Sequence, residues 1–254
     1  MLILLTRAMD EAMRTAAKLT AIGHHAILSP VLEMAPTGAQ WPPGVADAIL
    51  ATSTQAFELF SDSPQWPSPE ARRLIPLHVV GERTLQAARE RGFEGHGHVA
   101  PDAKALAPTI VKSLAGGAGS ARLVYLAGRD RKPDLERELK AAGHVVEAVE
   151  VYAAQPVDAL DEEAAALIDA GEIGAVMHYS RRSADIFLRL AQEAGVNVTN
   201  IAHVAISADA AQPLQAAAIQ CVHIADEPNE QGMLTVVRAV AAQDFVDRKQ
   251  GATP

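Results

Sequence analysis

Basic residues gather at the turns that follow the apolar runs of this chain, where they could bind an anionic ligand. Runs such as LILLT and RLVYLAG are followed closely by arginine. In an open parallel sheet, ligands bind at the carboxyl ends of the strands, where the next helix begins with free backbone N–H groups. Seven of the 22 lysine and arginine residues lie at such turns: Arg7, Arg83, Arg129, Arg131, Lys132, Arg181 and Arg182. This pattern predicts a small ligand with several negative charges.

Three serines and one tyrosine extend this candidate site. Ser53, Ser180 and Ser207 occur at turns of the same kind, where a serine either caps the following helix or donates a hydrogen bond to a ligand. Capping is the more common role of any one such serine, so both roles stay open. Tyr152 lies on a long predicted strand, and a buried tyrosine normally makes a hydrogen bond. We expect Tyr152 either to pack in a core or to face a ligand.

The sequence motifs of several common enzyme classes are absent. The loop GGAGS lacks the lysine of a phosphate-binding loop, and neither G-x-G-x-x-G after a strand nor G-x-S-x-G occurs. His24, His25, His96 and His98 fall on predicted strands, where successive side chains point to opposite faces. No carboxylate or cysteine is spaced to complete a metal site with them, so we expect no metal.

Apolar runs alternate with segments of helical spacing along nearly the whole chain. Strands are predicted at 2–6, 23–36, 47–53, 77–81, 96–100, 122–128, 143–156, 175–180, 200–207 and 220–226. Helices are predicted at 10–23, 53–60, 82–92, 102–115, 132–143, 158–171, 183–195, 208–218 and 229–243. This alternation is typical of α/β domains with parallel sheets, of the flavodoxin or Rossmann type. The tail 247–254 has no apolar pattern, and we expect it to fray.

Length and composition fit a soluble protein of two domains. The chain has 254 residues, of which 49% are apolar. The net charge of −9 argues against nucleic-acid binding, and the sequence contains neither a run long enough to span a membrane nor a basic leader. The single cysteine, Cys221, predicts a reducing cytoplasm, and its apolar neighbours predict a buried strand thiol.

Three pairs of segments resemble each other at nearly constant offsets. They are 23–36 with 143–156, 47–60 with 174–190, and 79–93 with 205–219. The second pair aligns Ser53 with Ser180. Three matches in the same order predict a duplicated unit, and therefore two similar α/β domains.

The two stretches of the first pair are each about twice as long as an average strand. A strand of that length can pair within one domain and continue into the next, so two such strands side by side would form a two-stranded β-ladder between the domains. The predicted boundaries are 1–30 and 157–254 for a discontinuous first domain, 41–148 for the second domain, and 31–40 and 149–156 for the ladder. A bent strand, or two short strands, would also fit these stretches.

Seven short motifs, taken in order, resemble the uroporphyrinogen-III synthase family over nearly the whole chain. They are TR (6–7), ATSTQAF (51–57), VVGERT (79–84), YLAGRDRKPDL (125–135), VEVYAAQP (149–156), HYSRRSA (178–184) and VAISADAA (204–211). The resemblance implies two α/β domains joined by a two-stranded ladder, with the first domain discontinuous.

The resemblance also implies an activity, that of a hydro-lyase of tetrapyrrole biosynthesis that needs no cofactor. Its substrate would be hydroxymethylbilane, a linear tetrapyrrole with many carboxylates. The product would be uroporphyrinogen III, formed with loss of water and inversion of ring D. We expect a cytoplasmic monomer that binds neither nucleic acid nor membrane, with transient contact to hydroxymethylbilane synthase.

The family's site residues carry over to this chain by position. Tyr152 matches the tyrosine proposed to assist departure of hydroxide. The predicted substrate-binding residues are Arg7, Ser53, Thr84, Gly128, Arg129, Arg131, Lys132, Ser180, Arg181 and Ser207. Two turns depart from the family pattern: Ala8 follows Thr-Arg where proline is common, and SADAA replaces a Gly-x-x-Thr-like turn.

Other classes of protein also fit the residues. A paralogue could bind a tetrapyrrole without converting it, and a two-domain small-molecule sensor would use the same kind of site. A sensor of this kind predicts a DNA-binding segment or an export signal, and the sequence shows neither. A nucleotide-sugar transferase with two α/β domains is a third class, which predicts thermal stabilisation by nucleotides.

Overall fold

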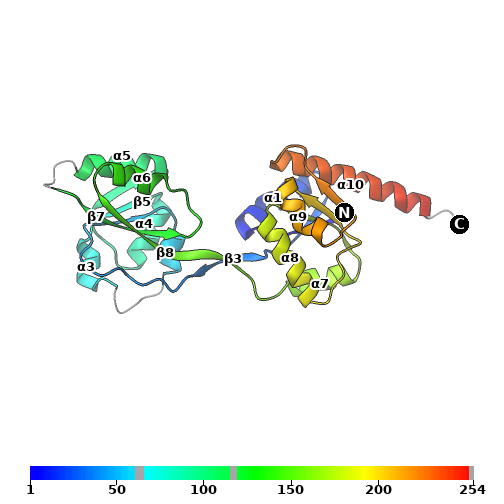
Figure 1. The fold of residues 1–254 in the computed structure, drawn as a ribbon, viewed down its shortest axis with the longest axis horizontal. Helices are drawn as coiled ribbons and strands as arrows, with labels where there is room; N and C mark the ends of the chain where they lie inside the picture. The colour runs from blue at the N-terminus through cyan, green and yellow to red at the C-terminus, as the bar shows by residue number, and fades with distance from the viewer. Residues whose placement is uncertain (61–65, 115–118, 252–254) are drawn as a thin grey trace. The chain divides into compact units, whose positions relative to one another are not determined.

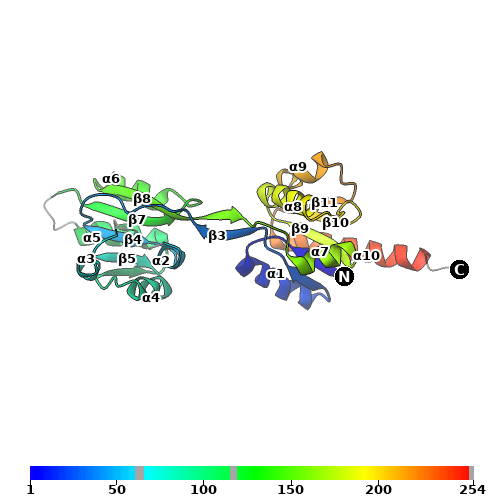
Figure 2. The ribbon, with the colours of Figure 1, turned by 90° about the horizontal axis from the view of Figure 1, so that it is seen from below.

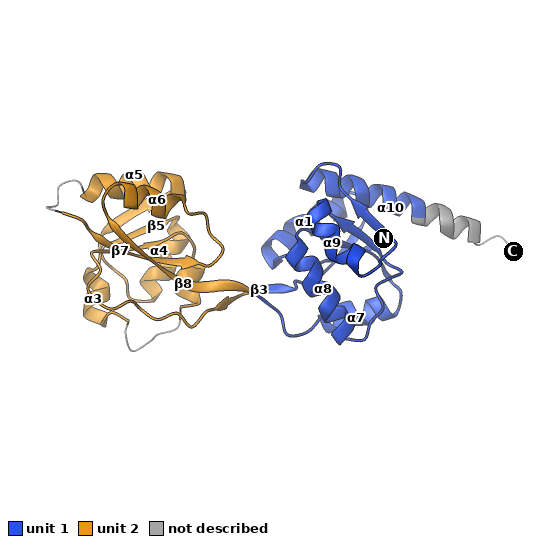
Figure 3. Ribbon diagram, in the orientation of Figure 1, with its two compact units in different colours: residues 1–33, 155–254 blue, residues 34–154 orange. Residues whose placement is uncertain are grey.

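The alternation of apolar runs and helical segments builds two sheets, each covered by helices on both faces. This computed structural model describes residues 1–60, 66–114 and 119–251. The chain divides into unit 1, residues 1–33 and 155–254, and unit 2, residues 34–154 (Figures 1 and 3). The predicted α/β class with parallel sheets is confirmed.

Unit 1 contains a five-stranded parallel sheet in the order β11–β10–β9–β1–β2. Its strands are β1 (Leu2–Leu5), β2 (His25–Leu28), β9 (Ile173–His178), β10 (Ala202–Ala205) and β11 (Val222–Ile224). One face packs against α1 (Met9–Ala21) and α10 (Glu230–Gly251). The other packs against α7 (Glu162–Asp169), α8 (Arg181–Glu193) and α9 (Ala208–Ala216). Because both faces are covered, β1 and β9 are almost entirely buried.

Unit 2 contains a six-stranded sheet in the order β3–β8–β7–β4–β5–β6. Its strands are β3 (Leu32–Pro36), β4 (Ala48–Ala51), β5 (Leu77–Val80), β6 (Gly97–Ala100), β7 (Arg122–Gly128) and β8 (Val145–Pro156). One face packs against α2 (Gln55–Glu58) and α4 (Glu82–Glu90), and the other against α5 (Ala103–Leu114) and α6 (Asp134–Ala141). Figure 2 shows α4 and α6 on opposite sides of this sheet.

The internal repeat is present in the topology of the two sheets. Each order can be read from the strand in which a long apolar stretch begins, which is β2 in unit 1 and β8 in unit 2. The orders are then β2–β1–β9–β10–β11 and β8–β7–β4–β5–β6. Segments that correspond in sequence therefore occupy corresponding places, β2 with β8, β9 with β4, and β10 with β5. The prediction of two similar parallel-sheet units is confirmed.

The two long apolar stretches differ in structure. The second is one strand of 12 residues, β8, as predicted. The first is not one strand: β2 ends at Leu28 and β3 begins at Leu32, so the alternative of two short strands is correct. Pro30 lies between them and has no N–H to donate to a neighbouring strand. β2 pairs with β1, whereas β3 pairs with β8.

The chain passes between the units inside β3 and inside β8, which are neighbours in one sheet. The backbone N–H of Thr37 donates to the carbonyl of Val151 at 3.1 Å within unit 2. The N–H of Val157 donates to the carbonyl of Val31 at 3.1 Å within unit 1. A two-stranded ladder of this kind was predicted from the sequence, with its first strand longer than the structure shows.

Several local predictions differ from the structure. Helix α3 (Pro69–Leu74) was not predicted, although Ser68 caps it and proline occupies its first turn. Cys221 is exposed and not buried, because it precedes β11, a strand of three residues at the sheet edge. Helix α10 continues to Gly251, into the tail 247–254, and the last three residues of this tail lie outside the described residues. The predicted GGAGS loop lies mostly outside the described residues.

None of the helices in the described ranges is both long enough and apolar enough to cross a membrane.

Candidate active site

A pocket of about 750 Å³ lies where β4 and β7 of unit 2 reach their carboxyl ends, beside Tyr152 of β8. The start of α5 and the first turns of α6 form its remaining walls. It brings together five of the residues predicted from the sequence: Ser53, Gly128, Arg131, Lys132 and Tyr152. Residues from distant parts of the chain meet here because parallel strands end at the same edge of a sheet.

Tyr152 lies directly against the backbone of Gly128. A Cβ atom built on Gly128 would lie 2.6 Å from Cε2 and 2.8 Å from Cζ of the Tyr152 ring. The two residues are opposite each other in the β7–β8 register, just after an irregularity between Ala127 and Gly128. The backbone N–H of Arg129 donates to the carbonyl of Tyr152 at 2.9 Å. Any side chain larger than hydrogen at position 128 would therefore displace the tyrosine ring.

Arg131 is held by carboxylates of the protein itself. Its Nε donates to Glu136 at 2.7 Å, and its Nη1 donates to Glu150 at 3.1 Å and to the carbonyl of Gly128 at 3.0 Å. Arg129 pairs with the other oxygen of Glu150 at 3.3 Å. The hydrogen bond that Arg131 donates is the largest of the causes that lower the pKa of the Glu150 carboxyl. A ligand carboxylate that binds Arg131 must share it with Glu150 or displace Glu150.

Two lysines of the pocket differ from Arg131 in their charged partners. Lys132 and Lys104 both line the pocket, and neither makes an ion pair with a carboxylate in the parts of the chain that the structure describes. Lys104 was missed by the sequence analysis, because it lies inside a predicted helix and not directly after a strand. Four acidic residues also line the pocket: Asp102, Asp130, Asp134 and Glu138. Anion binding here therefore depends on where the charges lie and not on a large excess of positive charge.

Tyr125 and Thr52 form a second polar group in the same pocket. Their hydroxyl oxygens are 3.0 Å apart. Burial raises the pKa of the Tyr125 phenol, against the opposing effect of its hydrogen bond with Thr52. The sequence analysis missed this pair because Tyr125 lies in the middle of an apolar run, where it reads as a core residue.

Two of the three predicted serines, Ser180 and Ser207, cap helices, which is the more common of the two roles. The Oγ atom of Ser180 accepts a hydrogen bond from the N–H of Ser183 at 3.1 Å at the start of α8. Ser207 accepts likewise from Ala210 at 3.2 Å at the start of α9. Ser53 accepts from the N–H of Gln55 at 3.3 Å in the turn before α2, but it does not cap this helix, whose N-cap position is occupied by Thr54. Each cap leaves part of the hydrogen-bonding capacity of the hydroxyl group available.

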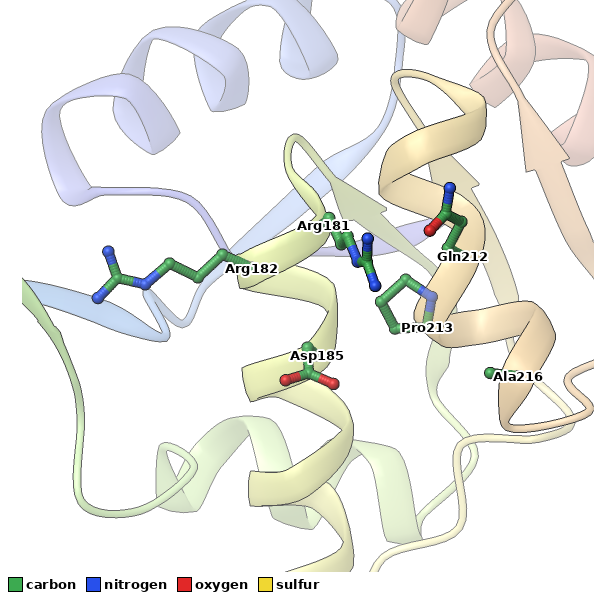
Figure 4. A pocket seen from close by; sticks show the side chains of 6 residues that line it. All are labelled: Arg181, Arg182, Asp185, Gln212, Pro213 and Ala216. Carbon is green, nitrogen blue, oxygen red and sulfur yellow. The ribbon is translucent and has the colours of Figure 1, made fainter.

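A pocket of about 730 Å³ in unit 1 lies between α8 and α9 (Figure 4). Arg181 points toward α9, where Gln212 and Pro213 lie, whereas Arg182 extends away from α9. Arg181 is within 4.0 Å of Asp209, and both side chains are largely exposed. The basic turn after β9 is therefore placed in a pocket as an anion site would require.

The other predicted residues line neither pocket. Arg7 pairs with Glu11 at 3.0 Å and with Glu230 at 3.1 Å, and its guanidinium lies 3.8 Å above the Tyr179 ring. Thr84 is buried in α4, with 4% of its surface exposed. Arg129 is exposed and pairs with Glu150. Among the described residues there is no group of three or more side chains that could together bind a metal ion.

Comparison with known proteins places these features in a family. The profile of the family described as "Uroporphyrinogen-III synthase HemD" matches residues 13–235. No curated protein matches the chain. The chain is similar to uroporphyrinogen-III synthetase from Helicobacter pylori, at 17% identity and a TM-score of 0.47, over 94% of this chain and 98% of that chain. It is also similar to uroporphyrinogen III synthase from Thermus thermophilus, at 15% identity and a TM-score of 0.41, over 96% and 99% of the two chains.

The family profile covers most of both units and includes every predicted site residue except Arg7. The chain belongs to the uroporphyrinogen-III synthase family and is an enzyme of tetrapyrrole synthesis.

Proposed function

We propose that the chain is a cofactor-independent hydro-lyase that converts hydroxymethylbilane to uroporphyrinogen III. The observation that carries this proposal is the unit 2 pocket, whose lining includes Tyr152 and two lysines that make no ion pair with a carboxylate of the described residues. The substrate is a linear tetrapyrrole whose side chains carry many carboxylates, and such groups suit Lys104, Lys132 and the hydroxyl of Ser53.

The reaction begins with the loss of hydroxide from the hydroxymethyl group of the substrate. A donated proton completes the departing water as the C–O bond breaks, and loss of the N–H proton of the same pyrrole leaves a neutral, electrophilic azafulvene. The substituted carbon of ring D attacks this centre to give a spirocyclic intermediate. The bond from that carbon to its original methylene bridge then breaks. The unsubstituted α-carbon of ring D bonds to the freed methylene and loses its proton, which closes the macrocycle with ring D inverted.

The task of the protein is to hold the chain for the correct bond, because the substrate also closes spontaneously without inversion. Catalysis then depends on orientation and on stronger binding of the transition state than of the substrate. Tyr152 supplies a phenol at the edge of the sheet, where it can donate to the departing hydroxyl group. Serine and lysine side chains of the pocket fix the carboxylates.

The remaining expectations form part of the same proposal. The enzyme works as a cytoplasmic monomer and receives its unstable substrate from hydroxymethylbilane synthase, with transient contact between the two proteins. Family membership supports the proposal for the substrate.

Freshly prepared hydroxymethylbilane provides the test. The products are oxidised to porphyrins, and the isomers are resolved by chromatography, with heat-inactivated protein as the control. A synthase gives isomer III in excess over isomer I. A spontaneous mixture rich in isomer I, together with tight binding of the substrate, would instead indicate a tetrapyrrole-binding paralogue. Metal chelators and exhaustive dialysis should leave the yield of isomer III unchanged.

A further inference from the structure

Tyr125 carries a hydroxyl group at a buried position that is otherwise packed with apolar side chains. It lies in the middle of β7, opposite Leu50 of β4 and Ala148 of β8, and only 3% of its surface is exposed. Its ring packs in the cluster that joins this face of the sheet to α5 and α6. A buried hydroxyl group without a partner costs about 1–3 kcal/mol in proteins, so its hydrogen bond decides whether tyrosine is tolerated there.

The partner of Tyr125 is Thr52, the residue directly after β4. The two oxygens are 3.0 Å apart, and both residues line the unit 2 pocket. Thr52 is half-buried, whereas Tyr125 is almost fully buried. Each hydroxyl group carries one hydrogen and can accept two hydrogen bonds. One of the two hydrogens lies in the shared bond, and the other remains available.

The direction of the shared bond follows from the chemistry of the two groups. A phenol is a stronger acid than an aliphatic alcohol, so Tyr125 is the better donor and Thr52 the better acceptor. The hydrogen that remains is therefore that of Thr52, on the side of the pocket. Donation from Tyr125 also polarises the Thr52 hydroxyl group and strengthens its own donation, because hydrogen bonds in a chain reinforce each other.

We propose that Thr52 donates this hydrogen to a carboxylate of the substrate, and that Tyr125 is a positioning residue that fixes the direction of the Thr52 hydroxyl group. The ligand is an acetate or propionate side chain of the tetrapyrrole, so this inference rests on the proposed function. Carboxylate is the chemistry that fits, since Lys104, Lys132 and Ser53 line the same pocket.

A purely structural role predicts different behaviour. In that case Thr52 serves only to satisfy the buried phenol, and loss of either hydroxyl group changes stability while turnover stays the same. A positioning role predicts that Tyr125 matters for catalysis only while Thr52 has a hydroxyl group to orient. A double-mutant cycle separates these two accounts.

The variants are Thr52→Val, Thr52→Ser, Tyr125→Phe and the double variant Thr52→Val/Tyr125→Phe. Thr109→Val is the matched control: its hydroxyl group donates to the carbonyl of Ala105 in α5, and it does not line the pocket. Steady-state kinetics with hydroxymethylbilane are measured with the isomer ratio, and thermal unfolding is followed for each protein.

The expected loss of kcat/KM for Thr52→Val is about 10- to 100-fold, the value of one hydrogen bond to a charged group. Thr52→Ser keeps the hydroxyl group and should stay within about threefold of the parent protein. Tyr125→Phe should lose about three- to tenfold, and it should cause no further loss in the Thr52→Val background. Thr109→Val should keep full activity.

Unchanged kcat/KM in folded Thr52→Val, or additive losses in the double variant, would overturn the inference. If Thr52→Val does not fold, Thr52→Ala replaces it. The single variant Tyr125→Phe also tests the positioning role by itself, because a normal kcat/KM in this variant would contradict that role. Failure of the proposed function is distinguishable, because the parent protein itself would then give no excess of isomer III.

Discussion

At the scale of single residues, the contact between Gly128 and Tyr152 is the most specific feature of the candidate site. The tyrosine ring occupies the space that a Cβ atom at position 128 would need. The hydrogen bond from Arg129 to the carbonyl of Tyr152 fixes the backbone beside it. The tyrosine is therefore positioned by the end of the neighbouring strand and does not depend on a loop for its orientation.

Substitution of Gly128 tests this positioning. Gly128→Ala should lower kcat by about 10- to 100-fold, because a shift of about 1 Å in a reacting group is enough for a loss of that size. Kinetics and thermal unfolding of the variant are measured with those of Tyr152→Phe. In the Tyr152→Phe background, the alanine should cause little further loss of kcat. Equal losses in both backgrounds would mean that Gly128 acts on something other than the phenol.

The site residues that could be predicted from the sequence are those at the carboxyl ends of strands, where parallel sheets bind ligands. Ser53, Gly128, Arg131 and Lys132 follow or end apolar runs, and the structure collects them in one pocket. Tyr125 could not be found in this way, because a tyrosine inside an apolar run has the pattern of a core residue. The pairing of Arg131 with Glu136 and Glu150 was also hidden, since it depends on side-chain geometry across β8 and α6.

At the scale of secondary-structure elements, the helix caps and the strand ends carry most of what the sequence could predict. The serines after β9 and β10 cap α8 and α9, in agreement with the more common role of serine at such turns. The predicted first long strand is broken by Pro30, whereas the second has no proline before its last residue and remains continuous. Helix α3 was missed because the stretch between β4 and β5 lacks a clear helical period.

Substitution of Ser207, which caps α9, distinguishes a structural role of its hydroxyl group from a role in substrate binding. Ser207→Ala should lower the free energy of unfolding by about 1 kcal/mol, because the N–H of Ala210 loses its acceptor. Ser207→Gly should lower it by only a few tenths of a kcal/mol, about the usual difference for glycine at this position. Urea unfolding measures both values. Unchanged stability with a raised KM in Ser207→Ala would show that substrate binding is the role of this hydroxyl group.

Two neighbouring strands of unit 1 carry a buried histidine pair, His178 on β9 and His203 on β10. Nε2 of His178 and Nδ1 of His203 are 2.9 Å apart, and Nε2 of His203 is 2.9 Å from the carbonyl of Val198. Nδ1 of His178 has no hydrogen-bond partner among the residues that the structure describes. Burial, and then the neighbouring His203, lowers the pKa of His178 well below its usual value; burial also lowers the pKa of His203.

The pair predicts a loss of stability in acid. Because the folded state keeps the rings neutral, the unfolded state binds more protons below a pH of about 6.5, and stability falls as the pH decreases through that range. Each buried imidazole contributes a slope of about 1.4 kcal/mol per pH unit until its own lowered pKa is reached. Urea unfolding between pH 7 and pH 5 should show a steeper decline for the parent protein than for His178→Leu/His203→Leu. Equal slopes would contradict this account.

At the scale of the whole molecule, one duplicated topology accounts for the organisation of the chain. Both sheets have the same order of corresponding strands, and the repeat was detectable because three segment pairs kept nearly constant offsets. The pairing of β3 with β8 continues the sheet of unit 2 beyond the repeated strands. Each unit places basic residues and serines at turns after its strands, in agreement with the proposed substrate, which carries many carboxylates.

In the proposed mechanism Tyr152, at the carboxyl end of the unit 2 sheet, assists the loss of hydroxide that starts cyclisation, and the pocket then directs the attack that inverts ring D. The most direct measurement is the fraction of isomer III formed from hydroxymethylbilane by the parent protein and by Tyr152→Phe, at equal concentrations and with unfolding temperatures compared. The account predicts almost complete isomer III for the parent. For folded Tyr152→Phe it predicts turnover lowered by about 100-fold, with spontaneous isomer I dominant. Tyr152→Phe that forms isomer III at the rate of the parent would contradict it.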